Sequence, residues 1–132
     1  MDCESNTNGL KLRLRRMPSK TVVWKHIDDI SPTTTSHGVG EKRVLTTQAE
    51  IGNPITQIAH TLLRVNEKVD LHKHPTMDEH FFFLDGECTI TVEESKYLCK
   101  GGDYLYVPAG HEHEVLVIKD TTIITIGISY EE

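Results

Sequence analysis

The residues of this chain that are best suited to chemistry fall in two short segments. The first segment supplies His72, His74 and Glu79, and the second, further along the chain, ends at His113. Three imidazoles and one carboxylate are ligands for a divalent transition metal such as Mn, Fe, Co, Ni, Cu or Zn, and they fit Mg or Ca poorly. On an octahedral ion, four such ligands leave two positions open for a substrate or for O₂. The two segments therefore predict one metal site.

The spacing of these residues favours their meeting at one place. His72 and His74 are two residues apart, so on a strand both side chains face the same side. A turn over residues 75–78 brings the chain back, and Glu79 then returns a carboxylate to the same region. Asp78 and His80 stand next to Glu79 and are alternative ligands on position alone.

The rest of the chain reads as short strands separated by turns. Runs rich in Val, Ile, Thr and aromatic residues end at Gly, Pro, Asn or Asp, and no segment has a convincing helical period. The longest expected strand is 55–65, and the dipeptide Asp85-Gly86 is expected to close a strand as a turn. The pattern predicts an all-β sandwich or barrel. Its expected strands are residues 21–27, 43–47, 55–65, 69–74, 79–84, 88–92, 97–99, 104–107, 113–118 and 121–129.

Length and charge narrow the class of protein. A chain of 132 residues suits one domain, here expected over residues 21–132 behind a polar, basic arm at residues 1–20. Met17 offers an alternative start of translation. The formal net charge of −6 argues against a broad nucleic-acid surface. No segment is apolar and long enough to cross a membrane, and there is no secretory signal, so we expect a cytoplasmic protein.

The three cysteines do not have the spacing of a metal site. Cys3, Cys88 and Cys99 are an odd number, and free thiols are the simplest interpretation. Cys88 and Cys99 flank an expected hairpin and are predicted to lie near each other. A disulfide between them would need closely spaced Cα atoms.

The two segments resemble the two motifs of the cupin superfamily. The first motif matches from His72 to Gly86 as His-x-His, four residues, Glu, six residues and Gly, although Asn66 replaces its opening glycine. The second matches from Gly102 to His113 as Gly, five residues, Pro-x-Gly, two residues and His, although Val117 replaces its final asparagine.

The resemblance implies a fold and a set of ligands. The implied fold is a small double-stranded β-helix, or jelly roll. The implied ligands of the metal are His72, His74, Glu79 and His113, because the six-residue interval to Gly86 selects Glu79 over its neighbours. The resemblance also implies a homodimer and a small-molecule ligand inside the barrel.

Three classes of function follow from the resemblance, because one fold serves many activities. A metal-dependent isomerase or epimerase acting on a sugar or sugar phosphate is slightly favoured. The alternatives are a non-haem metal dioxygenase and a non-enzymatic module that binds a small ligand. No cluster of Lys and Arg stands near the motifs to hold a phosphate; Lys73 and Arg64 are the nearest candidates.

Several other side chains are expected either to line the pocket or to have an ordinary role in packing or at the surface. Those that either line the pocket or serve packing and solvation are Gln57, His60, Tyr97, Tyr104 and Tyr106. Phe81, Phe82 and Phe83 are expected in the core and at a dimer face. His111 is expected to be exposed or to support a ligand, and His26 and His37 are expected to be solvated.

Overall fold

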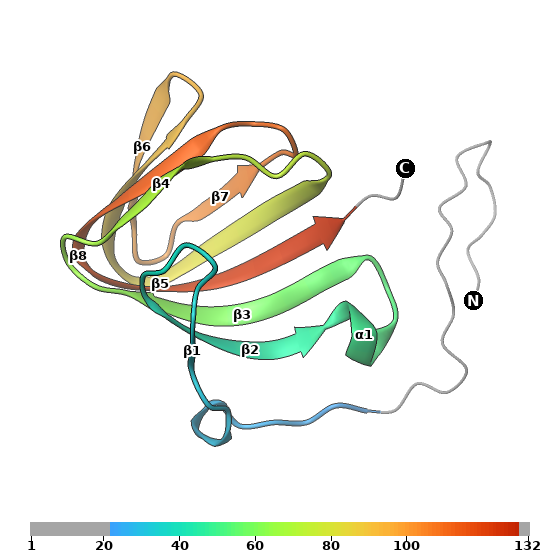
Figure 1. Ribbon diagram of the computed structural model, residues 1–132. Coiled ribbons are helices and arrows are strands. Elements are labelled where there is room, and N and C mark those ends of the chain that lie inside the picture. The colour runs from blue at the N-terminus through green and yellow to red at the C-terminus, as the bar shows by residue number, and fades with distance from the viewer. Residues whose placement is uncertain (1–21, 130–132) are drawn as a thin grey trace, which may run out of the picture.

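Two long antiparallel strands form the spine of the fold. A computed structural model describes residues 22–129 of the chain. In it, β5 (Met77–Val92) pairs with β8 (His113–Ser129) along almost their whole lengths. The first half of β5 pairs with the second half of β8, and the second half of β5 with the first half of β8. Both strands curve, so their two halves contribute to two facing layers (Figure 1).

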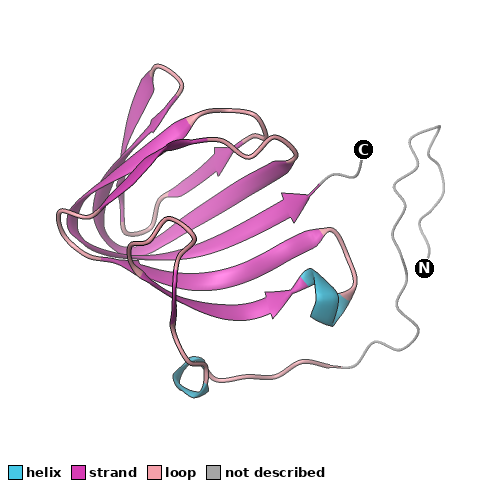
Figure 2. Ribbon diagram, viewed as in Figure 1, coloured by secondary structure: helices cyan, strands magenta, loops and turns pink. Residues whose placement is uncertain are grey.

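The shorter strands extend these two layers. One layer continues from β8 through β3 (Ile55–Leu63) and β2 (Glu41–Thr47) to β1 (Thr33–Thr34), with β7 (Tyr104–Val107) on the far side of β5. In the other, β4 (Lys68–His72) pairs with β8 and β6 (Ser95–Lys100) with β5. The short helices are η1 (Ile27–Asp29) and α1 (Gln48–Ile51). The rest of the described chain is strand and loop (Figure 2), which confirms the predicted all-β jelly roll.

Some expected elements are wrong in detail. Residues 22–26 form no strand; the chain there is exposed, and the His26 ring accepts a hydrogen bond from the Asp28 N–H at the start of η1. Asp85-Gly86 does not end a strand, because β5 runs through it with bulges while pairing with β8. The expected strands at 79–84 and 88–92 are thus one element, as are those at 113–118 and 121–129. β3 is therefore not the longest strand.

The bulges in β5 change which residues face inward. Phe81 and Phe83 are buried before the bulges, whereas Cys88 and Ile90 are buried after them, so the inward positions switch from odd to even numbers. A bulge inserts an extra residue on one strand and produces this switch. Both halves of β5 therefore pack into one core, which also includes Leu63, Val69, Val107, Val115, Val117 and Ile123.

The two cysteines in the described chain are free and buried. Cys88 and Cys99 are register partners on β5 and β6, which confirms that they are neighbours. Cys3, Met17 and the expected arm at residues 1–20 lie outside the described residues. No helix of the described part of the chain has the length and apolar character needed to span a bilayer.

Candidate metal centre

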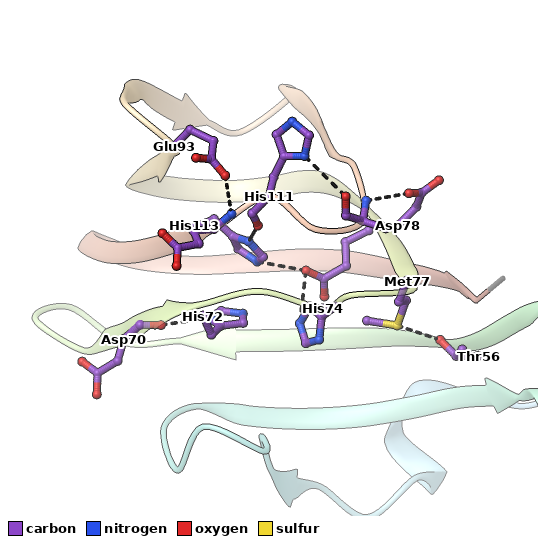
Figure 3. Close-up of polar contacts among 12 residues, drawn as sticks. Thr56, Asp70, His72, His74, Met77, Asp78, Glu93, His111 and His113 are labelled. Atoms are coloured by element: carbon purple, nitrogen blue, oxygen red, sulfur yellow. Dashed lines mark hydrogen bonds and ion pairs between the residues drawn. The ribbon is translucent and has the colours of Figure 1, made fainter. Parts of the chain in front are cut away.

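The structure brings the four predicted ligands together. His72, the last residue of β4, is the register partner of His113, the first residue of β8. His74 follows in the loop after β4, and Glu79 lies in the first half of β5. One donor atom from each residue can be chosen so that all four lie within 4.8 Å of one another. Figure 3 shows the three imidazoles grouped between these strands, with the ring of His111 pointing away.

Backbone carbonyls fix the orientation of two of the rings. The Nδ1–H of His72 donates to the carbonyl of Asp70 at 2.7 Å. The Nδ1–H of His113 donates to the carbonyl of His111 at 3.0 Å. A ring whose Nδ1 carries the proton presents Nε2 as its metal-binding atom. In both cases the partner is two residues earlier in the chain, so local backbone geometry prepares each ring for coordination.

A buried nitrogen without a hydrogen-bond partner is a second sign that these residues fit a metal. The Nε2 atom of His74 is buried and makes no hydrogen bond; the Glu79 carboxylate stands 3.6 Å from it. A buried polar atom without a partner is destabilising and calls for an explanation. Two metal–ligand bonds of about 2.0–2.2 Å span roughly 4.0–4.4 Å, so a small contraction of the cluster would bring all four donors onto one ion. A metal would then supply the missing partner of His74.

Glu79 and His113 form the polar centre of the cluster. The Nε2 of His113 lies 3.1 Å from the Glu79 Oε1. Burial would raise the pKa of Glu79, but the hydrogen bond to His113 and the neighbouring imidazoles hold it below its usual range. Burial would lower the pKa of His113, but the bonds to Glu79 and to the His111 carbonyl raise it. Both ring nitrogens of His113 thus face acceptors, and a proton on Nε2 occupies the position that a metal would take.

The two neighbours of Glu79 have other tasks. Asp78 is buried and accepts hydrogen bonds from the Ala109 N–H at 2.8 Å and from the Tyr106 hydroxyl at 2.9 Å. It thereby anchors the turn that leads to His113. His80 faces away from the cluster, as expected, and its ring bonds to the Tyr104 hydroxyl at 2.6 Å.

A cavity of about 210 Å³ adjoins the four predicted ligands. Pockets for drug-sized ligands are larger, about 300–1,000 Å³, so this one suits a small metabolite. Its apolar wall is built by core residues of β3, β4, β5 and β8, including Leu63, Phe81 and Ile90. Its polar wall includes His37, Lys42, Gln57, Thr61 and Thr125.

Not every expected pocket residue lies there. Gln57 lines the cavity, but His60, three residues later on β3, falls on the opposite face of the strand and does not. Tyr97, Tyr104 and Tyr106 are also absent from the lining and are exposed on the outside. The three belong to β6 and β7, whose outward positions face solvent.

The remaining expectations have mixed outcomes. Phe81 and Phe83 are in the core, while Phe82 is exposed on the outer face. His26 and His111 are exposed, and His111 supports His113 through its carbonyl.

Two residues of the site were missed in the sequence. His37 is exposed as expected, yet it lines the cavity, and its ring centroid is 4.2 Å from that of His72. Partial burial and the nearby His74 lower the pKa of His37. Lys42 comes from β2 and enters the cavity beside Thr61, its register partner. The alternation of Lys42 with Val44 was the available signal, but the pairing of β2 with β3 was needed to interpret it.

Known proteins resemble this chain in sequence and in fold. The chain is 27% identical over 115 residues to an uncharacterised protein of Methanocaldococcus jannaschii, covering 86% of this chain and 90% of that protein. The fold is similar to a predicted oxalate decarboxylase from Thermotoga maritima, with TM-score 0.72, 22% identity and coverage of 83% and 100% of the two chains. It is also similar to ectoine synthase from P. lautus, with TM-score 0.72, 16% identity and coverage of 82% and 78%.

These structural likenesses, each below 25% identity, show the fold alone, and the two proteins differ in named function. The family model of the cupin domain matches residues 59–127, which is more than half of the chain and includes all four predicted ligands. By that match, this protein is a member of the cupin family.

Proposed function

We propose that this protein is a metal-dependent enzyme that acts on a small molecule inside the barrel. The observation that carries the proposal is the cluster of His72, His74, Glu79 and His113 at the wall of a cavity, with the buried Nε2 of His74 lacking a partner. Three imidazoles and one carboxylate favour one divalent ion of Mn, Fe, Ni, Cu or Zn. When bound, such an ion would polarise a carbonyl or hydroxyl oxygen of the substrate as a Lewis acid.

An isomerase or epimerase is the reaction that the cavity supports best. An isomerase moves a proton between neighbouring carbons, and an epimerase removes and replaces a proton at one carbon, so either reaction needs a group that accepts and returns it. Among the residues that line the cavity, His37 is the imidazole outside the predicted ligand set. Its lowered pKa keeps its ring neutral, and hence able to accept a proton, near pH 7. In an isomerase, His37 would take a proton from the hydroxyl-bearing carbon next to the carbonyl and return it to the carbonyl carbon, while the hydroxyl proton passes to the former carbonyl oxygen.

A dioxygenase is the second candidate. The apolar wall, with Leu63, Phe81, Ile90 and Val115, favours a ligand with a nonpolar part and would keep water from a reactive centre. The substrate on this reading would be oxidised rather than rearranged.

Homodimer formation is also part of the proposal. Apolar side chains with more than two fifths of their area exposed lie on the strands outside the cavity, among them Phe82, Leu84 and Leu116. Exposed apolar groups of this kind are common where subunits meet. Dimerisation and a cytoplasmic location remain predictions, and sedimentation of the purified protein would test the first.

The first test is the metal content of the purified protein, measured by mass spectrometry. We expect about one equivalent of a transition metal in the wild type and none in a His72→Ala, His113→Ala double variant. A matched control is the His80→Ala, His111→Ala double variant, which removes two histidines from the same segments but none from the cluster. A wild-type protein that binds no metal after reconstitution would refute the proposal.

The metal then decides which reaction to assay. Redox-silent zinc together with aldose–ketose conversion would support the isomerase. Iron or copper together with O₂ uptake would support the dioxygenase. A metal-loaded protein that neither interconverts aldose and ketose nor consumes O₂ would support the third class, a non-enzymatic module that binds a small ligand.

A further inference from the structure

Lys42 brings a positive charge into the cavity, and the predicted metal ligands give no reason for a charge at that place. It stands on β2, outside the segments that carry the predicted ligands, and lines the cavity with Gln57 and Thr61. Its register partner Thr61 is buried, so this strand pair forms inner wall rather than rim. The wall made by β2 and β3 is therefore polar, while the floor made by core residues is apolar.

Lys42 is a partly buried lysine without an acidic partner in the described chain, whereas Lys68, Lys73, Lys96 and Lys100, which also lack one, are exposed. Lys25 pairs with Glu50, Arg64 with Glu41 and Asp120, and Lys119 with Glu87. Within residues 22–129, no carboxylate is within ion-pair distance of the Lys42 ammonium. The residue is partly buried, and a buried charge without a counter-ion is unfavourable unless something compensates it. A ligand that carries a negative charge would do so.

The charge of the cavity leads to the same conclusion. Among the lining residues of the described part of the chain, Glu79 is the one acidic residue and Lys42 the one lysine or arginine, so the formal charges of these two groups cancel. A bound divalent ion would raise the formal charge of the cavity to +2. A positively charged cavity inside a chain of formal net charge −6 selects anions from solution.

We propose that the natural ligand is a small hydroxy- or oxo-carboxylic acid whose carboxylate pairs with Lys42. Thr61, the register partner of Lys42, supplies a further polar group beside that carboxylate, and Gln57 lines the cavity further along β3. A carboxylate fits better than a phosphate, because Lys42 is the one lysine or arginine among the lining residues within 22–129, and a phosphate offers three oxygens for such charged donors to bind. The volume of about 210 Å³ limits the ligand to a small acid.

This assignment rests on the proposed function, since the hydroxyl or carbonyl of the acid would face the metal cluster. It refines the expected sugar or sugar phosphate to an acid that bears a carboxylate. Lys42 replaces Lys73 and Arg64 as the residue that holds the anion: Lys73 does not line the cavity, and Arg64 is engaged in ion pairs.

Calorimetric binding to the full-length, metal-loaded protein tests the assignment. The probes are lactate, 3-hydroxybutyrate and 4-hydroxybutyrate, which differ in the distance between hydroxyl and carboxylate, each compared with its neutral amide. Glycerol phosphate tests the phosphate alternative. The variants are Lys42→Met, which removes the charge, and Lys42→Arg, which keeps it. Lys73→Met is the matched control, because it removes an exposed charge next to the metal ligands but outside the cavity.

We expect the wild type to bind at least one of the acids more tightly than its amide, and Lys42→Met to weaken that binding about tenfold or more, as charged hydrogen bonds do when lost. Lys42→Arg and Lys73→Met should stay near the wild type. Equal binding of acids and amides, unchanged acid binding in Lys42→Met, or preference for glycerol phosphate would overturn the assignment.

The metal content of every variant is measured beside the binding. Wild-type protein without metal would refute the proposed function, and the comparison of acid with amide would then be run on the metal-free protein. Dependence on Lys42 in that form would support the carboxylate site by itself, and its absence would overturn it.

Discussion

Replacing Gly86 by alanine should destabilise the fold severely, even though alanine adds a single methyl group. Gly86 lies in the bulged middle of β5, with φ +99°, and a Cβ there would meet the backbone of Asp120 and Thr121, with the Thr121 Cα at 2.5 Å. Thr121 is fully buried, and its hydroxyl accepts a hydrogen bond from the Glu87 N–H at 3.0 Å. Neither strand can move away without breaking the ladder that holds β5 against β8.

The structure also provides a control for the conformational part of this effect. Gly102 has φ +94°, close to that of Gly86, but a Cβ there would meet nothing within 4 Å. Alanine in the left-handed region is unfavourable by about 1–2 kcal/mol, and this applies to both sites. Overpacking adds about 1–3 kcal/mol at Gly86 alone. Gly86→Ala should therefore lose about 2–5 kcal/mol, against about 1–2 kcal/mol for Gly102→Ala.

Urea unfolding of the metal-free proteins, followed by far-ultraviolet circular dichroism, measures the difference. Fluorescence is a poor probe, because the single tryptophan, Trp24, is 93% exposed. The midpoint should fall much further for Gly86→Ala, with an unchanged slope in both variants. Equal losses of unfolding free energy in the two variants would show that backbone conformation alone explains the need for both glycines. They would contradict a steric clash between a Cβ at position 86 and the backbone of β8.

Two further predictions follow from the pKa shifts. Burial lowers the pKa of His113, but its hydrogen bonds, chiefly the one to Glu79, leave it raised, and a metal must displace this proton. Apparent metal affinity should therefore rise with pH by up to about tenfold per unit until the pH passes the pKa of His113, and affinities that are flat between about pH 5 and 8 would contradict this. Burial raises the pKa of Cys88 from 9.0 to about 12 and that of Cys99 to about 11. The thiolate fraction of Cys88 is then about a thousandfold below that of a free thiol, so iodoacetamide should modify Cys88 and Cys99 slowly in the native protein and fully in urea, as site-resolved mass spectrometry would show.

The sequence predicted the metal cluster better than the cavity beside it. The spacing of His72, His74 and Glu79 encodes their common location locally, since strand alternation and one turn suffice to bring them together. His113 could be added because its motif resembles that of a known family. The cavity wall depends on which strands pair, and alternation within one segment does not reveal that. Gln57 and His60 illustrate this point. The prediction from sequence was the same for both, that they line the pocket or have a plain structural role, although they fall on opposite faces of β3.

The bulges of β5 explain the errors in strand length. Asp85-Gly86 has the composition of a turn, and in isolation it would end a strand. Here β8 continues alongside and keeps both halves of β5 in register on either side of the bulges. A pairing partner about thirty residues away therefore decides between turn and bulge, and such long-range pairing is not visible in a local pattern.

The position of the family match divides the site into two parts. The match covers residues 59–127 and includes the four predicted metal ligands. His37, Lys42 and Gln57 all precede it, although they line the same cavity. The part of the site that would hold a metal is thus built from the segment that defines the family, whereas three polar residues of the cavity wall come from the chain in front of that segment. Proteins with a similar fold have different named functions, so a fold does not fix specificity. The cavity residues that precede the family match, His37, Lys42 and Gln57, are therefore where the specificity of this protein should be sought.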